Sequence, residues 1–159
     1  RNSSYLIFKI IRKIYKKLLK DLNNKQIKIN IVGEKKNLPE DILKIFKKIK
    51  YSNDHNLQLN IAFNYGTQYE VKNIIESLIK KNSKKIDLKM IRQKMYLGNI
   101  PDPEILIRTG GFQRLSNFIL LNLSYSDLFF TNTLWPEFSI EELENIFAKY
   151  INIKKNYGL

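Results

Sequence analysis

The stretch Ile105-Leu106-Ile107-Arg108-Thr109-Gly110-Gly111-Phe112-Gln113-Arg114-Leu115-Ser116-Asn117-Phe118 decides the fold. Its apolar start predicts a strand over residues 104–108 that is covered on both faces. A charged loop with two glycines follows, and the apolar spacing beyond it predicts a helix over residues 114–123. Ligands bind at the carboxyl ends of strands in open α/β sheets, so this loop is placed to hold one.

The side chains and amides of this loop have the chemistry of a phosphate site. Gly110 and Gly111 let the backbone approach a ligand closely, and their N–H groups can face an anion. Ser116 lies where the predicted helix begins, so its hydroxyl and the nearby amides would add donors. Arg108 and Arg114 flank the loop with forked cationic donors suited to phosphoryl oxygens. On these residues alone, a phosphate or diphosphate site and a plain strand–loop–helix with two surface arginines fit equally well.

Two further positions are candidates for the same site. The loop Asn64-Tyr65-Gly66 follows an apolar segment and would lie on the same rim of the sheet; taken alone, it is typical of a turn that leaves a strand. Asp127 precedes Phe129-Phe130 and could hold Mg²⁺ against a diphosphate. Taken alone, such an aspartate is more often a solvated residue at the start of a strand.

Strands and helices alternate outward from this segment. The apolar pattern predicts strands at residues 26–32, 57–63, 104–108 and 127–131, and helices at 4–22, 40–50, 68–81, 86–96, 114–123 and 140–150. This alternation predicts an α/β fold with a central, largely parallel sheet flanked by helices. We see no internal repeat and no interdomain linker, so we expect residues 1–159 to form a single domain.

Composition excludes several classes of protein. The 159 residues are 43% hydrophobic, which is enough for a substantial core. The absence of cysteine excludes a disulfide scaffold, a thiolate metal site and a cysteine nucleophile. The single histidine, His55, excludes multi-histidine metal sites and argues against a Ser-His-Asp triad. No apolar run approaches the roughly 18 residues needed to cross a bilayer.

The chain carries a formal net charge of +13, from 28 basic and 15 acidic residues. This balance favours nucleic acid, anionic membranes or phosphorylated metabolites as partners. Most of the basic residues are lysines spread thinly along the chain, which fits a solvated surface better than a binding face. A basic nucleic-acid-binding domain therefore stays as the weaker alternative, because it would need clustered arginines and an aromatic platform.

Several blocks together resemble one known family. Arg108–Phe118, Tyr125-Ser126-Asp127-Leu128 and Thr133-Leu134-Trp135-Pro136-Glu137-Phe138 are similar to the C-terminal signature of the cis-prenyltransferases, the undecaprenyl and dehydrodolichyl diphosphate synthases. Ile61-Ala62-Phe63-Asn64-Tyr65-Gly66 resembles the family's mid-chain strand and loop. The blocks occur in the family's order and at its spacing over nearly the whole chain.

The resemblance implies a Mg²⁺-dependent transferase with a cis-prenyltransferase-like fold. Such an enzyme condenses isopentenyl diphosphate with an allylic diphosphate, such as farnesyl diphosphate. Each condensation forms a new double bond with cis geometry. The product is a long-chain polyprenyl diphosphate, a precursor of dolichol or of a bacterial lipid carrier. The residues implied are Arg108, Arg114, Ser116, Gly110 and Gly111 for isopentenyl diphosphate, Asn64 and Gly66 for the active-site rim, and Asp127 for the metal.

The chain departs from the family pattern at several positions. Asp127 stands where the family usually has Glu, and Phe112 replaces the usual Glu after the glycines. The family's Asp-Gly-Asn-Gly-Arg block, which carries the catalytic aspartate, does not occur in residues 1–159. We therefore expect residues 1–159 to be a cis-prenyltransferase-like domain that lacks its N-terminal third, and to be inactive by themselves.

Partners and location follow from the same resemblance. It implies a homodimer, with a heteromer also possible, no nucleic acid, and contact with a membrane surface through the apolar product. The cytoplasm, the surface of an intracellular membrane such as the endoplasmic reticulum, and an organelle are all compatible. A non-catalytic subunit of a heteromeric prenyltransferase is the other function left open, although the retained arginines and Ser116 argue against it.

Overall fold

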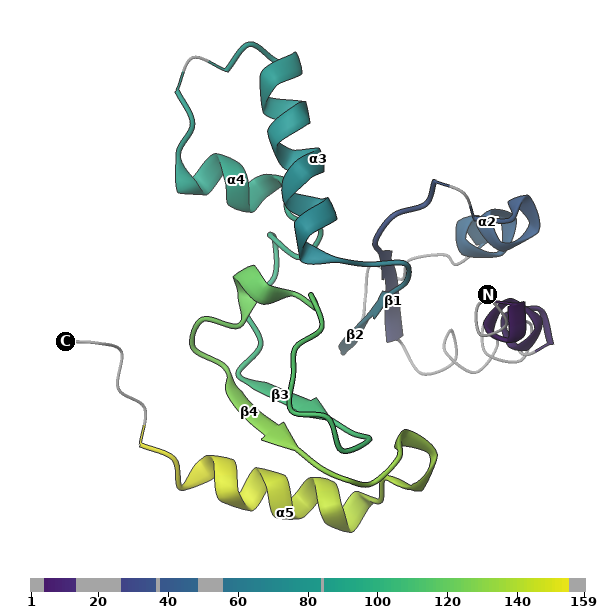
Figure 1. Cartoon of the computed structure of the whole chain (residues 1–159), viewed down its shortest axis with the longest axis vertical. Coiled ribbons are helices and arrows are strands. Elements are labelled where there is room, and N and C mark those ends of the chain that lie inside the picture. Colours follow the sequence, from purple (N-terminus) through teal and green to yellow (C-terminus); the bar gives the residue numbers. More distant parts are fainter. Residues whose placement is uncertain (1–4, 14–26, 37, 49–55, 84, 155–159) are drawn as a thin grey trace. The chain divides into compact units, whose positions relative to one another are not determined.

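The computed structural model describes residues 5–13, 27–36, 38–48, 56–83 and 85–154 (Figure 1). The chain divides into two compact units, Arg1–Tyr65 and Gly66–Leu159. Each unit contains one pair of parallel strands, which confirms the predicted α/β class with parallel strands. One domain with one central sheet remains a prediction. None of the described helices is long and apolar enough to span a membrane.

The first unit is built on β1 (Ile27–Val32) and β2 (Leu57–Ala62), which pair from Ile27 opposite Leu57 to Val32 opposite Ala62. Helix α2 (Glu40–Lys48) buries Ile42 and Ile45, which lie one helical turn apart on the same face. These isoleucines and two residues of β1, Ile29 and Val32, are the buried apolar residues of the described part of this unit.

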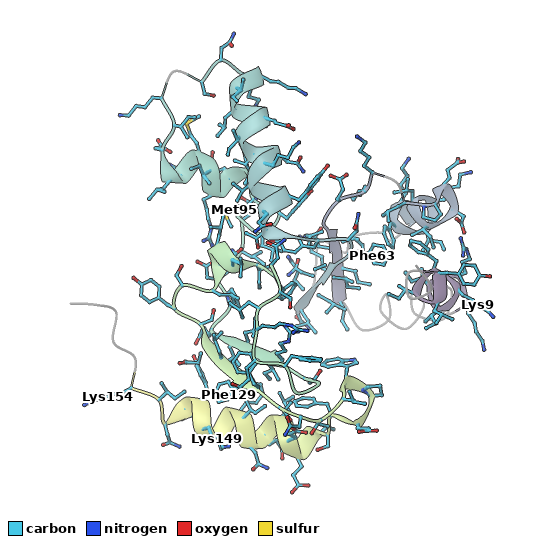
Figure 2. The ribbon with its side chains drawn as sticks, in the orientation of Figure 1. Lys9, Phe63, Met95, Phe129, Lys149 and Lys154 are labelled. Carbon is cyan, nitrogen blue, oxygen red and sulfur yellow. The ribbon has the colours of Figure 1, made fainter. Side chains whose placement is uncertain are left out.

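A predicted helix precedes β1. Residues 5–13 are helical, and the rest of the predicted helix at 4–22 lies outside the described residues. Phe63, the residue after β2, has its ring centroid 5.8 Å from that of Phe8 and 5.6 Å from that of Phe46 (Figure 2). Phe63 therefore joins helix 5–13 to α2 through aromatic packing.

The second unit contains a longer series of elements, which confirm most of the predicted ones within a few residues. They are α3 (Thr67–Lys80), α4 (Leu88–Lys94), β3 (Ile105–Arg108), the 3₁₀ turn η1 (Leu120–Asn122), β4 (Asp127–Phe130), the 3₁₀ turn η2 (Trp135–Glu137) and α5 (Ile140–Ile151). Strands β3 and β4 are parallel, with Ile105 opposite Asp127 and Arg108 opposite Phe130. Helix α5 runs along this strand pair (Figure 1).

A small core lies between α3 and the region of α4. It consists of Ile74, Leu78 and Met95, with Met90 and Ile91 packed against it. Ile74 and Leu78 are four residues apart, so both lie on one face of α3.

Arg92 holds the connector between α4 and β3. Its guanidinium donates to Asp102 Oδ2 at 2.8 Å and to the Ile100 carbonyl at 3.0 Å. Asp102 Oδ1 also accepts from the buried Asn122 at 2.8 Å. The hydrogen bond from Arg92 lowers the pKa of the Asp102 carboxyl, and the bond from Asn122 adds to this effect. The clamp thus fixes the chain just before the strand that leads to the site.

The lowered pKa of Asp102 predicts a pH-dependent contribution to stability. Because its folded-state pKa lies below the ordinary value of 3.8, the clamp contributes fully above that value and is lost as the pH falls through the folded pKa. The carboxylate is 45% exposed, so we expect at most about 1 kcal/mol. The difference in unfolding free energy between wild type and Asp102→Asn should be largest at pH 7 and shrink below pH ~4.

Urea denaturation at a series of pH values measures this difference. Glu144→Gln, which changes an exposed carboxylate on α5, is the matched control. A stability difference for Asp102→Asn that stays constant down to pH ~2.5 would contradict the ion-pair origin of the effect.

Candidate functional site

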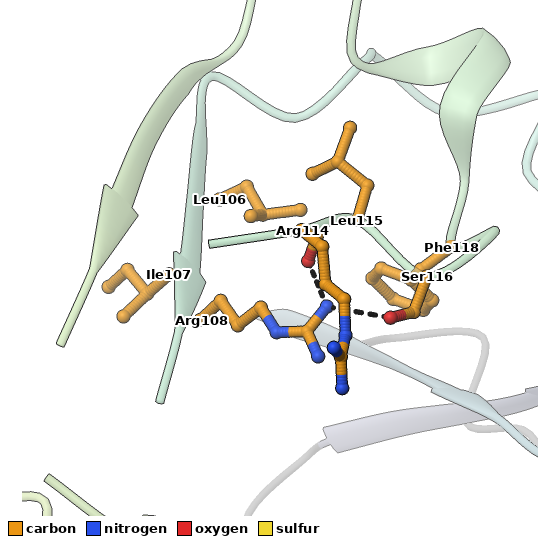
Figure 3. A pocket seen from close by; sticks show the side chains of 7 residues that line it. All are labelled: Leu106, Ile107, Arg108, Arg114, Leu115, Ser116 and Phe118. Atoms are coloured by element: carbon orange, nitrogen blue, oxygen red, sulfur yellow. Dashed lines mark hydrogen bonds between the residues drawn. The ribbon is translucent and has the colours of Figure 1, made fainter. Parts of the chain in front are cut away.

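A cavity of about 220 Å³ opens beside the end of β3 (Figure 3). Pockets for drug-sized ligands begin at about 300 Å³, so this cavity suits a small molecule or one end of a larger one. Its lining brings the predicted Arg108, Arg114 and Ser116 together. The lining residues are Leu106, Ile107, Arg108, Arg114, Leu115, Ser116 and Phe118.

Arg108 is the centre of the polar part of this cavity. It ends β3, and its Nη1 donates to Ser116 Oγ at 3.0 Å and to the Arg114 carbonyl. The Ser116 hydroxyl accepts this bond, so its own O–H hydrogen can donate to a ligand. Arg108 thereby holds both other polar residues of the cavity in place.

Arg114 is positioned by an aromatic ring. Its Cζ lies 4.2 Å from the centroid of the Phe112 ring, a cation–π contact. Figure 3 shows the guanidinium groups of Arg114 and Arg108 extending to the same side of the cavity, near Ser116. The aromatic residue that replaces the family's usual Glu therefore supports the arginine without neutralising it.

The cavity has an uncompensated positive charge within the described part of the chain. Arg12 and Arg92 each form an ion pair with a carboxylate, at 2.5 Å and 2.8 Å. Arg108 and Arg114 form none among the described residues. Two cations side by side repel each other unless an anion binds between them, so the arrangement favours a doubly charged ligand.

The predicted helix over residues 114–123 is wrong. Ser116, Asn117 and Ile119 have positive φ values of 48°, 64° and 36°, and only the 3₁₀ turn η1 forms in this segment. Ser116 is therefore not a helix N-cap, because no helix of the described chain begins at this residue.

The start of α3 explains why the helix does not form. The amides of Thr67 and Gln68 have no partner within their own helix. They donate to the main-chain carbonyl and the side-chain oxygen of Asn117, at 2.9 and 3.0 Å. Thr67 Oγ1 in turn accepts from the Leu120 amide at 2.9 Å. These long-range bonds satisfy the end of α3 and outweigh the local helical pattern. Sequence reasoning missed Asn117, and the only signal was that asparagine tolerates positive φ.

The amides of the two loop glycines do not face the cavity as predicted. The Gly110 amide donates to the Thr133 carbonyl at 2.9 Å, and the Gly111 amide donates to the Thr131 carbonyl at 2.8 Å. Their φ values of 90° and 79° explain why glycine is needed. The glycines shape the loop, and of the predicted phosphate donors the two arginines and Ser116 remain.

The two predicted rim residues lie in different units. A Cβ on Gly66 would come 2.7 Å from Asn117 Nδ2, so Gly66 lies against the segment that carries Ser116. Asn64 belongs to the first unit, where its Nδ2 donates to the Glu34 carbonyl at 3.0 Å and its own carbonyl accepts from the Glu34 amide at 3.2 Å. Asn64 ties the loop after β2 to the loop after β1, and its role at an active-site rim stays a prediction.

Asp127 does not line the cavity. It pairs with Ile105 at the amino end of the strand pair, about 10 Å from the level of Arg108 at about 3.3 Å per residue. Its Oδ2 is buried without a hydrogen-bond donor, the kind of oxygen that a hard cation takes. However, the described part of the chain contains no group of three or more acidic or histidine residues placed so that they could hold a metal ion. The described residues therefore do not by themselves form a Mg²⁺ site beside the two arginines.

The second unit thus carries two arginines on one small cavity, an arrangement that would suit an anionic ligand. Comparison with known proteins narrows the class of protein. The family described as "Putative undecaprenyl diphosphate synthase" matches residues 2–158. The chain therefore belongs to the cis-prenyltransferase family, which confirms the resemblance drawn from its motifs.

Curated relatives in this family are isoprenyl transferases. That of Thermotoga maritima is 36% identical over 143 residues, which are 86% of this chain and 61% of the relative. That of Fusobacterium nucleatum is 32% identical over 154 residues, which are 96% of this chain and 66% of the relative. The chain thus spans about three-fifths to two-thirds of the length of these relatives.

Two solved structures share the fold over the whole chain. One is described as a probable undecaprenyl diphosphate synthase from Campylobacter jejuni, with a TM-score of 0.84, 23% identity and 76% of that protein covered. The other is lavandulyl diphosphate synthase from Lavandula x intermedia in complex with dimethylallyl diphosphate, with a TM-score of 0.88, 24% identity and 73% covered. At these identities the likeness shows a common fold.

Proposed function

We propose that this chain supplies the isopentenyl diphosphate half of a cis-prenyltransferase active site. The observation that carries the proposal is that Arg108 and Arg114 line one small cavity without a carboxylate partner among the described residues, whereas Arg12 and Arg92 are paired. Two guanidinium groups and the Ser116 hydroxyl match the donors that a diphosphate needs.

The rest of the cavity suits the carbon end of the same ligand. Leu106, Leu115 and Phe118 give it apolar walls next to the cationic groups. A diphosphate that carries a short isoprenoid chain matches this lining, because one of its ends is apolar and the other carries the negative charge. Free phosphate would use the arginines alone and leave the apolar wall in contact with water.

In the proposed reaction the chain's own residues bind and orient the acceptor. Arg108 and Arg114 hold the diphosphate of isopentenyl diphosphate. Ser116, which is held by Arg108, donates its hydroxyl hydrogen to the same diphosphate and so orients it. The double bond of the ligand then lies in a fixed place when the allylic C–O bond of the second substrate breaks. Orientation of one substrate is the contribution that these residues make; the allylic diphosphate is proposed to bind through residues beyond this cavity.

Titration of the full-length protein with isopentenyl diphosphate, followed by calorimetry, tests the proposal. Inorganic diphosphate should compete, and isopentenol, which lacks the phosphates, should not. Radiolabelled isopentenyl diphosphate with farnesyl diphosphate and Mg²⁺ should then give polyprenyl diphosphates with cis double bonds. Absence of isopentenyl diphosphate binding would overturn the proposal, whereas binding without turnover would support the alternative of a non-catalytic subunit.

Asp127 remains a predicted metal ligand, which would need further ligands from substrate oxygens or from residues outside the described part. Asp127→Asn should raise the Mg²⁺ concentration that gives half-maximal activity, and Asp127→Glu should retain the wild-type value. Isopentenyl diphosphate affinity measured without metal should be unchanged in both, because Asp127 does not line the cavity. A Mg²⁺ requirement equal to that of wild type in Asp127→Asn would remove this residue from the metal site.

The family likeness also suggests which partners this protein has and where it acts, and we include both in the proposal. The second substrate would be an allylic diphosphate such as farnesyl diphosphate. The protein would act as a homodimer, or as one subunit of a heteromer, in the cytoplasm or on the surface of an intracellular membrane that takes up the apolar product. Sedimentation of the full-length protein with and without lipid vesicles tests the assembly and the membrane contact.

A further inference from the structure

We propose that Glu142 is a positioning residue for the isopentenyl diphosphate site, although it does not line the cavity. Its carboxylate holds the loop after β4, and that loop holds the segment that carries Arg108. The inference rests on the proposed function, because it assigns Glu142 a role in the affinity for that ligand.

Glu142 lies in the first turn of α5. Ser139 caps this helix, and its Oγ accepts from the Glu142 amide at 3.1 Å. A serine followed three residues later by glutamate is the pattern of a capping box, in which the glutamate side chain turns back to its own helix end. Here the half-buried carboxylate reaches the loop after β4 instead. Its Oε1 accepts from the hydroxyls of both Thr131 and Thr133, the latter at 3.2 Å.

Both threonines are bonded to residues 108–114, which we call the arginine loop. The Thr131 amide donates to the Arg108 carbonyl at 3.0 Å. The Gly111 amide donates back to the Thr131 carbonyl at 2.8 Å, and the Gly110 amide donates to the Thr133 carbonyl at 2.9 Å. Three main-chain bonds therefore join the two residues that Glu142 holds to the arginine loop.

The polar part of the cavity depends on the position of this loop. Arg108 ends β3, and its side chain in turn holds Ser116 and the Arg114 carbonyl. A shift of the loop would move Arg108 away from the position that binds a diphosphate, and displacements of about 1 Å can cost large factors in such sites. Glu142 thus acts on the ligand through Thr131 and Thr133.

The geometry also predicts which substitutions at position 142 preserve the hydrogen bonds from Thr131 and Thr133. Glutamine at position 142 retains an oxygen that can accept from both hydroxyls. Alanine removes it and leaves two partly buried hydroxyls without this acceptor. Glu141 and Glu144 are exposed on the same helix, so their substitution by alanine changes the charge without touching the loop.

The test compares Glu142→Ala, Glu142→Gln, Glu141→Ala and Glu144→Ala in the full-length protein. Calorimetry with isopentenyl diphosphate, and separately with farnesyl diphosphate, gives the two dissociation constants, and thermal unfolding gives the stability. We expect Glu142→Ala to weaken isopentenyl diphosphate binding about tenfold, the loss of roughly one hydrogen bond to a charged group. Farnesyl diphosphate binding should be unchanged, and Glu142→Gln should retain most of the isopentenyl diphosphate affinity.

A second variant covers the case in which Glu142→Ala does not fold. Thr131→Val with Thr133→Val removes the hydrogen bonds to Glu142, together with the one from the Thr133 amide to Thr131 Oγ1. It leaves the cap of α5 intact and should weaken isopentenyl diphosphate binding at least as much. An unchanged isopentenyl diphosphate affinity in a folded variant would overturn the role of Glu142, as would an equal loss for both substrates. If wild-type protein itself does not bind isopentenyl diphosphate, the proposed function fails and this inference falls with it.

Discussion

Arg108→Ala is expected to raise the dissociation constant of the full-length protein for isopentenyl diphosphate by about ten- to hundredfold. The substitution removes a charge-assisted donor to the diphosphate, worth about 1.5–3 kcal/mol. It also releases Ser116 Oγ and the Arg114 carbonyl, which Arg108 holds in the free protein. The loss should therefore exceed that of Ser116→Ala, which removes one neutral hydroxyl. Arg114→Ala should fall between them, because Arg114 is held by the Phe112 ring and holds no other cavity residue.

Two further variants separate this specific effect from a general loss of charge. Arg108→Lys keeps the cation and lacks the planar fork, so it should restore only part of the affinity. Arg12→Ala removes the same charge from an arginine that pairs with Asp41 outside the cavity, and it should bind like wild type. Equal weakening in Arg12→Ala and Arg108→Ala, measured by calorimetry at constant ionic strength, would mean that only the net charge of the protein matters.

Elements with a clear apolar period were predictable from the sequence. Helix α3 was expected at residues 68–81 and forms at Thr67–Lys80, and α5 was expected at 140–150 and forms at Ile140–Ile151. Their buried residues, such as Ile74 and Leu78, follow from the pattern itself. The sequence also placed Arg108, Arg114 and Ser116 in one loop, and they line one cavity; their role toward a diphosphate stays a prediction.

The segment after Arg114 shows what the local pattern could not predict. Its apolar spacing is helical, yet its backbone is set by hydrogen bonds between Asn117 and the first amides of α3, which lie far away in the sequence. The same holds for Gly110 and Gly111, whose amides bind the loop after β4 instead of facing a ligand. In both cases a main-chain group found a partner from a distant segment. Residue types suggest what could bind, whereas the partners of the main chain decide which donors are left for a ligand.

The contact of Glu142 with the loop after β4 could not be predicted from the sequence either. Its position in a Ser-x-x-Glu pattern is typical of a helix cap, and nothing in the sequence connects it to Thr131 and Thr133. For Asp127 the residue type suggested a place beside the cavity. The strand register instead places it at the other end of the strand pair.

Gly33→Ala, in the first unit, is expected to lower the stability of the protein strongly. Gly33 follows β1 with a φ of +116°, a conformation that side chains with a Cβ rarely adopt. A Cβ built there would lie 2.1 Å from the Phe63 carbonyl oxygen and 3.1 Å from the carbonyl carbon. That oxygen belongs to the main chain, so it can yield only if the end of β2 moves. We expect Gly33→Ala to lower the free energy of unfolding by about 3 kcal/mol.

Gly110→Ala separates the two causes of this loss. Gly110 also has a positive φ, +90°, but its nearest neighbour to a built Cβ is Leu134 Cδ2 at 3.9 Å. It should therefore cost only the conformational part, about 1–2 kcal/mol. Chemical denaturation of both variants gives the difference, which measures the contact with Phe63. Equal losses would contradict the steric part of the argument.

The same contact connects stability to the predicted rim of the active site. Phe63 donates its amide to the Val32 carbonyl at 2.8 Å, and Asn64 exchanges two hydrogen bonds with Glu34. These bonds fasten the ends of β1 and β2 to each other only while the backbone at Gly33 lies close to Phe63. If Asn64 belongs to the site, Gly33→Ala should weaken substrate binding even at temperatures where the variant is folded. Wild-type substrate affinity in folded Gly33→Ala protein, with reduced stability, would instead confine Gly33 and Asn64 to a structural role, because the rim would then tolerate the displacement that the added Cβ forces.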